Sequence, residues 1–287
     1  MDILVAGASG YLGRFITTEL HRRGYRVRAI VRDRARAEGP GRAGAPSLAG
    51  SVDEWFVGDI RDPKIRDKAA DGTGWVISAL GVTRQGADPM DIDLEANTGL
   101  LDSAWKGKAP GFSYVHVAGA KNCPARLVKA KEAFVAKLED SPLTTHVIEP
   151  SAYFSDMVSV LKMARSGLIP ILNPTVRCNP IHGADLATHI ADGVEVSHSG
   201  TTTVGGPEIL TWPEIAQLAF NAHGRRGFTP HVPSKTLVSL LRKVAKVDSV
   251  RSSPAIFATW AMSHDAVGDP IGSHHLGDFF KEQASAH

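Results

Sequence analysis

A glycine-spaced turn near the start of the chain constrains the fold more than any other feature. The motif GASGYLG, with Gly7, Gly10 and Gly13, directly follows the apolar run of residues 3–6 and opens into a helical pattern over residues 11–23. Each glycine has a steric purpose: Gly7 permits a tight turn, Gly10 lets backbone N–H groups approach a ligand, and Gly13 lets the helix pack closely on the strand. Because the amino-terminal end of a helix is positive, the pattern predicts an anion site at this turn.

The next strand indicates which anion fits. Residues 26–31, RVRAIV, follow the stop signal Gly24, so strand, glycine turn, helix and second strand fall within the length of a dinucleotide-binding unit. A glycine-rich loop without a ligand is the alternative, and the second strand favours the nucleotide. In this motif the residues predicted to bind the cofactor are Gly7, Ser9, Gly10, Tyr11, Leu12 and Gly13.

The composition excludes several other classes of protein. The chain has 287 residues, a formal net charge of +2 and no apolar run long enough to span a bilayer, so we expect neither a nucleic-acid nor a membrane surface. A core strand begins almost at once, which leaves no room for a signal peptide and predicts a cytoplasmic protein. Cys123 and Cys178 lie far apart, and no His/Cys cluster has metal-ligand spacing, so neither a disulfide nor a metal site is expected.

Apolar runs alternate with helical patterns through the first half of the chain. Further strand candidates lie at residues 55–57, 75–77, 114–117 and 146–148. This alternation predicts an α/β fold of the Rossmann type, with a doubly wound parallel sheet whose carboxyl edge binds ligands. Residues 33–51, rich in Arg, Ala, Gly and Pro, predict a long, mobile loop with a short helical piece.

After Pro150 the alternation becomes irregular. Helical patterns cover residues 154–165, 185–194, 212–223 and 235–246. We therefore predict an NAD(P)-binding Rossmann domain over residues 1–152. Residues 153–287 are predicted to form a smaller, mostly helical substrate-binding region, partly interleaved with the Rossmann sheet.

The end of the second strand distinguishes the two nicotinamide dinucleotides. An acidic residue there binds the ribose 2′-hydroxyl, whereas a basic one accommodates a 2′-phosphate. The residue is Arg32, to which Arg14, Arg34 and Arg36 add charge, so NADP(H) is favoured over NAD(H), although Asp33 follows directly. The predicted adenosine pocket then continues after the third and fourth strands with Asp59, Ile60, Ala79, Leu80 and Gly81.

The order of these motifs resembles the short-chain dehydrogenase/reductase (SDR) superfamily, particularly its extended and atypical branches. The segments GASGYLG, IVRD, VGDI and SALG follow one another as in that family, and residues 93–101 and 179–187 look like its helix before strand five and its late strand-to-helix turn. The chain looks like an atypical member, similar to NmrA-like, isoflavone reductase-like and NAD(P)-dependent epimerase-like proteins. The resemblance therefore implies the fold and the cofactor more specifically than the reaction.

The resemblance also shows a departure at the reacting groups. Aligning Lys131 with the family lysine places Leu127 where the usual Tyr stands, and residues 117–120 end strand five without the usual Ser. We expect Lys131 to bind the nicotinamide ribose and to serve as an acid or charge stabiliser. A surface lysine is the alternative.

The loop after strand six is the second candidate for the nicotinamide end. Backbone groups of Pro150, Ser151 and Ala152 are predicted to bind the carboxamide, and Tyr153 is a candidate catalytic hydroxyl, with simple packing as its alternative. His182 has the right pKa range for a general base, but its neighbours indicate a turn and a helix cap instead.

These observations leave three functional hypotheses. The first is an NADP(H)-dependent oxidoreductase that reduces a small organic molecule by hydride transfer, since nicotinamide supplies the hydride without the missing Tyr. The second is a redox-neutral isomerase, epimerase or cyclase on the same scaffold. The third, from the likeness to NmrA-like proteins, is a non-catalytic NADP(H)-sensing regulator. A homodimer is compatible with the superfamily.

Overall fold

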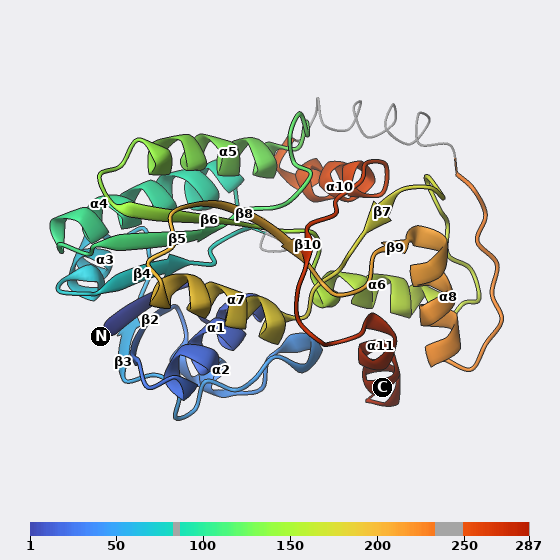
Figure 1. Ribbon diagram of the computed structural model, residues 1–287, viewed down its shortest axis with the longest axis horizontal. Helices are drawn as coiled ribbons and strands as arrows, with labels where there is room; N and C mark the ends of the chain where they lie inside the picture. Colours follow the sequence, from blue (N-terminus) through green and yellow to red (C-terminus); the bar gives the residue numbers. More distant parts are fainter. Residues whose placement is uncertain (83–86, 233–248, 287) are drawn as a thin grey trace. The chain divides into compact units, whose positions relative to one another are not determined.

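The computed structural model describes residues 1–82, 87–232 and 249–286 (Figure 1). Its central element is a parallel sheet of eight strands in the order β10-β8-β6-β5-β4-β1-β2-β3. The sheet strands are β1 (Asp2–Ala6), β2 (Arg26–Val31), β3 (Glu54–Val57), β4 (Trp75–Ser78), β5 (Gly111–Val115), β6 (Thr144–Pro150), β8 (Gly200–Gly205) and β10 (Asp269–Pro270). The order reverses between β1 and β4, which confirms the predicted Rossmann-type α/β fold and places the turn after β1 at the reversal.

The described residues also contain helices and a separate strand pair. The helical elements are α1 (Tyr11–Arg22), α2 (Arg34–Glu38), the 3-10 turn η1 (Arg42–Gly44), α3 (Pro63–Ala70), the π-helical segment η2 (Met90–Ala96), α4 (Asn97–Lys106), α5 (Arg126–Glu139), α6 (Phe154–Ala164), α7 (Gly183–Glu195), α8 (Trp212–Ala222), α10 (Ser249–Ala261) and α11 (Leu276–Ser285). Strands β7 (Arg177–Cys178) and β9 (Leu210–Thr211) form a short antiparallel pair.

The first compact unit comprises residues 1–116, 129–148 and 186–202. Strands β1 and β4 are buried on both faces, which explains their continuous apolar runs in the sequence. On one face, Leu100 of α4 and Phe134 of α5 pack with Phe112 of β5 in a single apolar core. On the other face α1 and α7 lie side by side (Figure 1), joined by ion pairs from Arg23 to Asp192 and Glu195 at 2.7 and 2.9 Å.

The second unit comprises residues 117–128, 149–185 and 203–287, within the described ranges. Helices α6, α8 and α11 carry its largest buried aromatic side chains, Phe154, Phe220 and Phe280. Phe154 and Phe279 lie with ring centroids 5.2 Å apart. Both units take residues from before and after position 152.

Two predicted elements differ in their bounds. The strand expected at residues 114–117 begins at Gly111 and ends at Val115, because Gly111 and Ser113 are buried in the sheet yet give no apolar signal. The helix expected from Asp93 begins as the π-helical segment η2, because the side-chain amide of Asn97 donates to the carbonyls of Ile92 and Asp93 at 3.2 and 3.0 Å.

Two further predictions concern the loop after the second strand and a helix late in the chain. Residues 33–51 contain the short helical piece that we expected, α2, followed by the 3-10 turn η1. The helix predicted at residues 235–246 lies outside the described residues.

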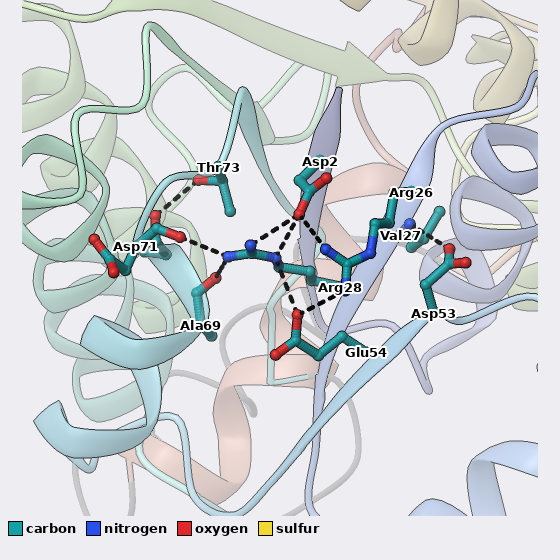
Figure 2. Close-up of polar contacts among 10 residues, drawn as sticks. Asp2, Arg26, Val27, Arg28, Asp53, Glu54, Ala69, Asp71 and Thr73 are labelled. Carbon is teal, nitrogen blue, oxygen red and sulfur yellow. Dashed lines mark hydrogen bonds and ion pairs between the residues drawn. The ribbon is translucent and has the colours of Figure 1, made fainter.

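A polar network closes the amino-terminal ends of β1, β2 and β3 (Figure 2). At its centre Arg28 of β2 forms an ion pair with Asp2 at 2.8 Å and donates to the carbonyl of Asp71 at 2.6 Å. Its Nε also lies 3.4 Å from a carboxylate oxygen of Glu54 on β3. This network lies at the opposite strand ends from the glycine turn, so it holds the sheet rather than the ligand site.

The described part of the chain contains no helix long and apolar enough to cross a bilayer. Within the same residues no three His, Cys, Asp or Glu side chains are grouped to hold a metal ion. Cys123 and Cys178 are buried free thiols.

Candidate functional site

The glycine turn after β1 has the geometry that the sequence predicts. Gly7 has a φ of +78°, which favours glycine, and its carbonyl accepts a bond from the Gly10 N–H at 2.9 Å. A Cβ at Gly7 would lie 2.7 Å from the carbonyl oxygen of Ala79, and one at Gly13 would lie 2.1 Å from that of Gly7. The turn is therefore closed against the end of β4 and against α1, and no larger residue fits at either position.

The amino-terminal end of α1 keeps its positive character. Its N-cap, Gly10, supplies no side-chain acceptor, and the first turn contains no acidic residue. Ser9 and Gly10 are exposed, Leu12 is buried, and Tyr11 packs edge-on against Phe15 with ring centroids 5.3 Å apart. An exposed, uncapped helix start suits a diphosphate, so the residues present fit the predicted dinucleotide.

The end of β2 presents basic side chains. Arg32 and Arg36 are exposed, whereas Arg34 pairs with Glu38 at 2.9 Å and lies 5.3 Å from the Trp55 ring centroid. Asp33, the acidic residue that complicated the choice of cofactor, accepts the Arg36 N–H at 3.0 Å and caps α2. The carboxylate at this edge therefore has a structural partner, and the basic groups remain at the surface.

Arg14 has a different environment from the other three arginines. It is 4% exposed, and its guanidinium donates to five backbone carbonyls, those of Ser9, Arg36, Ala37, Gly39 and Pro46. Its charge lies inside the protein, beneath the segment that follows β2, and not on the surface where we expected it to add to Arg32.

Asp59, after β3, is held as a carboxylate. Arg61 contacts both of its oxygens, and this pairing lowers the pKa of Asp59 to about 2. Arg32 lowers it further through its charge. Asp59 therefore remains a hydrogen-bond acceptor at neutral pH, while the neighbouring Ile60 is buried.

The chain after β4 passes close to the turn after β1. The Ala79 N–H donates to the Ala6 carbonyl at 3.0 Å, and Leu80 and Gly81 are half-buried. A Cβ at Gly81 would lie 3.3 Å from a carboxylate oxygen of Asp93 and 3.4 Å from Nζ of Lys131. The predicted adenosine-side loop and the predicted catalytic lysine thus lie in one place within the first unit.

Three acceptors surround the ammonium of Lys131. Nζ lies 3.1 Å from Oδ1 of Asp93, 3.2 Å from the hydroxyl of Tyr114 and 3.3 Å from the carbonyl of Val115. The Asp93 side chain has 0% exposure, and its other oxygen accepts the Val82 N–H at 3.0 Å. A carboxylate this deeply buried needs a cation beside it, so the ion pair holds the Lys131 side chain in place.

Two neighbours of this pair have strongly altered proton affinities. Burial raises the pKa of Tyr114 to about 12, against the opposing charge of Lys131. Burial, helped by the charge of Lys131, lowers the pKa of His116 to about 4. His116 is 7% exposed, and within the described residues its Nδ1 has no hydrogen-bond partner. The cluster therefore places a neutral imidazole and a neutral phenol beside a fixed cation.

The loop after β6 belongs to the second unit. Ser151 is buried, its N–H donates to the Val204 carbonyl at 2.9 Å, and its hydroxyl donates to the Ala266 carbonyl. The carbonyls of Pro150 and Ala152 accept bonds from Ala118 and Ile181 at 2.9 and 2.8 Å. Much of the backbone predicted to bind a carboxamide thus has protein partners.

Tyr153 and His182 lie near one another in the second unit. Tyr153 is half-buried, forms a β-bridge with Ile181 and is the N-cap residue of α6. His182 precedes α7, where its Nδ1 lies 3.3 Å from the Ala184 N–H, and its ring stacks on His274 at 4.2 Å. Burial lowers the pKa of His182 to about 4, which suits the helix-cap interpretation better than a general base.

Sequence reasoning missed Asp93 and Tyr114 as members of the site. Asp93 was only part of a helix, and Tyr114 only part of a strand. A buried acid in η2 and the lysine of α5 give no joint signal, because their proximity depends on the fold. The one available clue was a charged residue within an apolar helical pattern.

Together, the reversal of strand order, the glycine turn and the lysine cluster define the class: the chain has the fold of an atypical SDR. The sequence model of the NmrA-like family matches residues 1–139. Over this first part the chain is therefore similar to the NmrA-like family, as its motifs indicated.

Individual relatives are more distant. Divinyl chlorophyllide a 8-vinyl-reductase of Arabidopsis thaliana is 25% identical, with an alignment covering 100% of this chain and 74% of that protein. The chain spans 57–65% of the length of three other plant proteins of that name.

Solved structures share the fold over almost the whole chain. The NADPH-dependent quinone oxidoreductase of Escherichia coli, complexed with NADPH, has a TM-score of 0.70 at 16% identity and covers 99% of both chains. Triphenylmethane reductase of Citrobacter sp., complexed with NADP(H), has a TM-score of 0.73 at 18% identity and covers 98% of this chain and 99% of its own. These likenesses establish the fold.

Proposed function

We propose that this chain is an NADP(H)-dependent oxidoreductase that reduces a small organic molecule by hydride transfer. The observation that carries the proposal is the occurrence, in one unit, of an uncapped glycine turn and a buried lysine–aspartate pair beside Gly81. The names of the relatives, which include a vinyl reductase and a quinone oxidoreductase, point to the same reaction class.

The dinucleotide is held by backbone and basic groups in this proposal. Its diphosphate lies on the N–H groups at the start of α1, its 2′-phosphate on Arg32, and its adenosine against Asp59 and Ile60. The chain from Ala79 to Gly81 passes beside the cofactor. When bound, the nicotinamide supplies the hydride.

Lys131 acts as a fixed positive charge in this mechanism. Because Asp93 is fully buried against it, loss of its proton would leave an uncompensated carboxylate in the interior. We therefore assign Lys131 to binding the nicotinamide ribose and to stabilising negative charge that develops on the substrate. The neutral His116 beside it adds a hydrogen-bonding group without a second charge.

Residues 153–287 are proposed to supply the substrate-binding region, with Tyr153 as its catalytic hydroxyl. The remaining backbone groups of residues 150–152 would bind the carboxamide. We further propose that the chain lacks the usual Ser and Tyr of the superfamily, with Leu127 at the Tyr position. The cytoplasmic location and the homodimer stay predictions.

Oxidation of NADPH by the purified protein tests the proposal. We expect loss of absorbance at the reduced-nicotinamide band with at least one of menadione, 2-cyclohexenone and benzaldehyde, and a clear loss of that rate in Lys131→Met. NADPH binding without net oxidation over a broad carbonyl and enone panel would overturn the reductase. Chiral analysis of recovered substrate then identifies a redox-neutral isomerase, and an unchanged substrate leaves the NADP(H)-sensing regulator.

A further inference from the structure

Arg14 is an unusual buried cation. Its Nε donates to the Ser9 carbonyl at 3.2 Å, inside the glycine turn. Its terminal nitrogens donate to Arg36 at 2.9 Å, Ala37 at 3.0 Å, and Gly39 and Pro46 at 2.8 Å each. One guanidinium therefore joins the turn that follows β1 to the segment that follows β2.

Carbonyl oxygens are the partners found for the Arg14 guanidinium in the described residues. Among the ion pairs of the described residues, none includes Arg14. Burial and the charge of Arg36 both lower the pKa of Arg14, so its place in the interior is maintained by carbonyl oxygens. Such a group carries a large desolvation cost, which the five hydrogen bonds offset.

The segment that Arg14 holds is built closely around it. Ala37, Ala45 and Leu48 are buried, although the sequence there is polar and rich in Gly and Pro. At Gly41 an added Cβ would lie only 2.7 Å from Cδ of Arg14. Without the guanidinium, the buried carbonyl of Ala37 and three partly buried carbonyls of this segment would lose a donor, and the backbone would have to turn toward water.

We propose that Arg14 is a positioning residue for coenzyme selectivity: it fixes the segment of residues 36–46 so that the basic groups at the end of β2 meet a 2′-phosphate. This inference rests on the proposed NADP(H) binding. The direct link is the bond to the carbonyl of Arg36, whose side chain is exposed, as is that of Arg32. Arg14 thereby acts through the backbone and does not itself reach the ligand.

Binding measurements with two pairs of ligands test this role without any substrate. We expect Arg14→Met to raise the Kd of NADPH and of 2′,5′-ADP by about tenfold or more, and the Kd of NADH and of AMP by less than about threefold. Arg14→Lys keeps the charge but loses the planar fork, so its selectivity should fall between that of the wild type and that of Arg14→Met.

Two further variants separate positioning from charge and from folding. Gly41→Ala places a methyl group 2.7 Å from Cδ of Arg14 and from Cβ and the carbonyl oxygen of Ala45, so it should displace the segment and lower NADPH selectivity with the guanidinium intact. Arg22→Met removes an exposed charge from the same helix and should leave all four affinities unchanged. Circular dichroism and the Tm of each variant establish that it folds.

The outcomes distinguish this inference from the proposed function. If the wild type binds neither dinucleotide, the proposed function fails and the inference fails with it. If the wild type binds NADPH while Arg14→Met and Gly41→Ala keep its selectivity, only the inference is overturned. An equal loss of NADPH and NADH affinity in Arg14→Met also overturns the inference. Arg14 would then support the glycine turn, which both coenzymes use, rather than the recognition of the 2′-phosphate.

Discussion

At the scale of single residues, the Lys131–Asp93 pair determines what the lysine does. The Lys131 side chain is 13% exposed and faces a carboxylate with 0% exposure. Its ammonium also contacts the hydroxyl of Tyr114 and the carbonyl of Val115. The ion pair therefore ties Lys131 of α5 to the buried Asp93 of η2.

A double-mutant cycle checks this coupling. Lys131→Met leaves the buried Asp93 carboxylate without its cation, so we expect it to lower the free energy of unfolding by about 2–4 kcal/mol. Adding Asp93→Asn should recover much of that loss, because the uncompensated charge is removed. Urea unfolding followed by tryptophan fluorescence gives the change in the free energy of unfolding for Lys131→Met, for Asp93→Asn and for the double variant. If the two single changes simply add up in the double variant, the two side chains are not coupled.

Gly13 offers a second prediction at this scale. Gly13→Ala places a Cβ 2.1 Å from the Gly7 carbonyl oxygen, so α1 must move away from the turn. We expect NADPH binding to weaken by at least about a hundredfold, since the N–H groups lose their alignment. Calorimetry measures this loss. Gly277→Ala in α11, where the nearest atom is a flexible leucine methyl at 3.3 Å, is the control and should bind normally.

The sequence predicted residues whose role is local and missed those whose role depends on the fold. Gly7, Gly10 and Gly13 act on one turn, so their spacing alone indicated their purpose. Lys131 came from the family resemblance. Its partners Asp93 and Tyr114 come from η2 and β5, and their side chains meet Lys131 only because α5 crosses that face of the sheet.

At the scale of elements, the polar network of Figure 2 joins the amino-terminal ends of β1, β2 and β3 through Arg28. Arg26 and Arg28 lie on the same face of β2 and contact the same two carboxylates, those of Asp2 and Glu54. They differ in burial, because the Arg26 side chain is 52% exposed and that of Arg28 is 14% exposed. Arg26 and Arg28 can therefore be compared directly, because they share the same carboxylate partners and differ in burial.

We expect Arg28→Met to destabilise the fold by about 1–2 kcal/mol, because Asp2 and the carbonyls of Ala69 and Asp71 lose a charged donor. Arg26→Met should cost less than about 0.5 kcal/mol, because its ion pairs are exposed and screened. Chemical denaturation of both variants compares them directly. Equal losses would show that Arg28 contributes no more than a surface charge.

Elements that bury apolar residues at a regular spacing were predictable, and those organised by polar contacts were less so. Residues 2–6 and 26–31 gave clear strand patterns because β1 and β2 lie in the interior of the sheet. Residues 36–46 gave only a loop with a short helical piece. The backbone of this segment is held by Arg14, which donates to its carbonyls. Hydrogen bonds from a single distant side chain produce no periodic pattern in the segment's own sequence.

At the scale of the whole molecule, buried histidines link stability to pH. Burial lowers the pKa of His116 and His146 in the first unit, and of His182 in the second, to about 4. An unfolded chain exposes each of them and restores its usual pKa. Below that usual value the unfolded state binds more protons, so stability is fully present above pH 6.5 and is lost as the pH falls toward 4.

His146 isolates one contribution to this effect. It is 1% exposed, its Nε2 contacts the Thr202 hydroxyl at 2.9 Å, and the rings of His198 and His189 lie 4.5 and 6.1 Å away. A pKa of about 4 against an unfolded value of 6.5 corresponds to a loss of about 2 kcal/mol between pH 7.5 and pH 5. Carboxylates of ordinary pKa stay ionised in this window, so histidine dominates.

The corresponding variant is His146→Gln, whose amide can still bond to Thr202 but does not titrate. We expect its free energy of unfolding to be below that of the wild type at pH 7.5, because Gln does not refill the site that Gly193 lines. The gap should narrow by about 1–2 kcal/mol at pH 5, since only the wild type then binds a proton at this site on unfolding. Urea titrations at both pH values measure the gap. A gap that stays constant would mean that His146 has the same pKa in the folded and the unfolded protein, and the acid sensitivity would then have to come from His116 and His182.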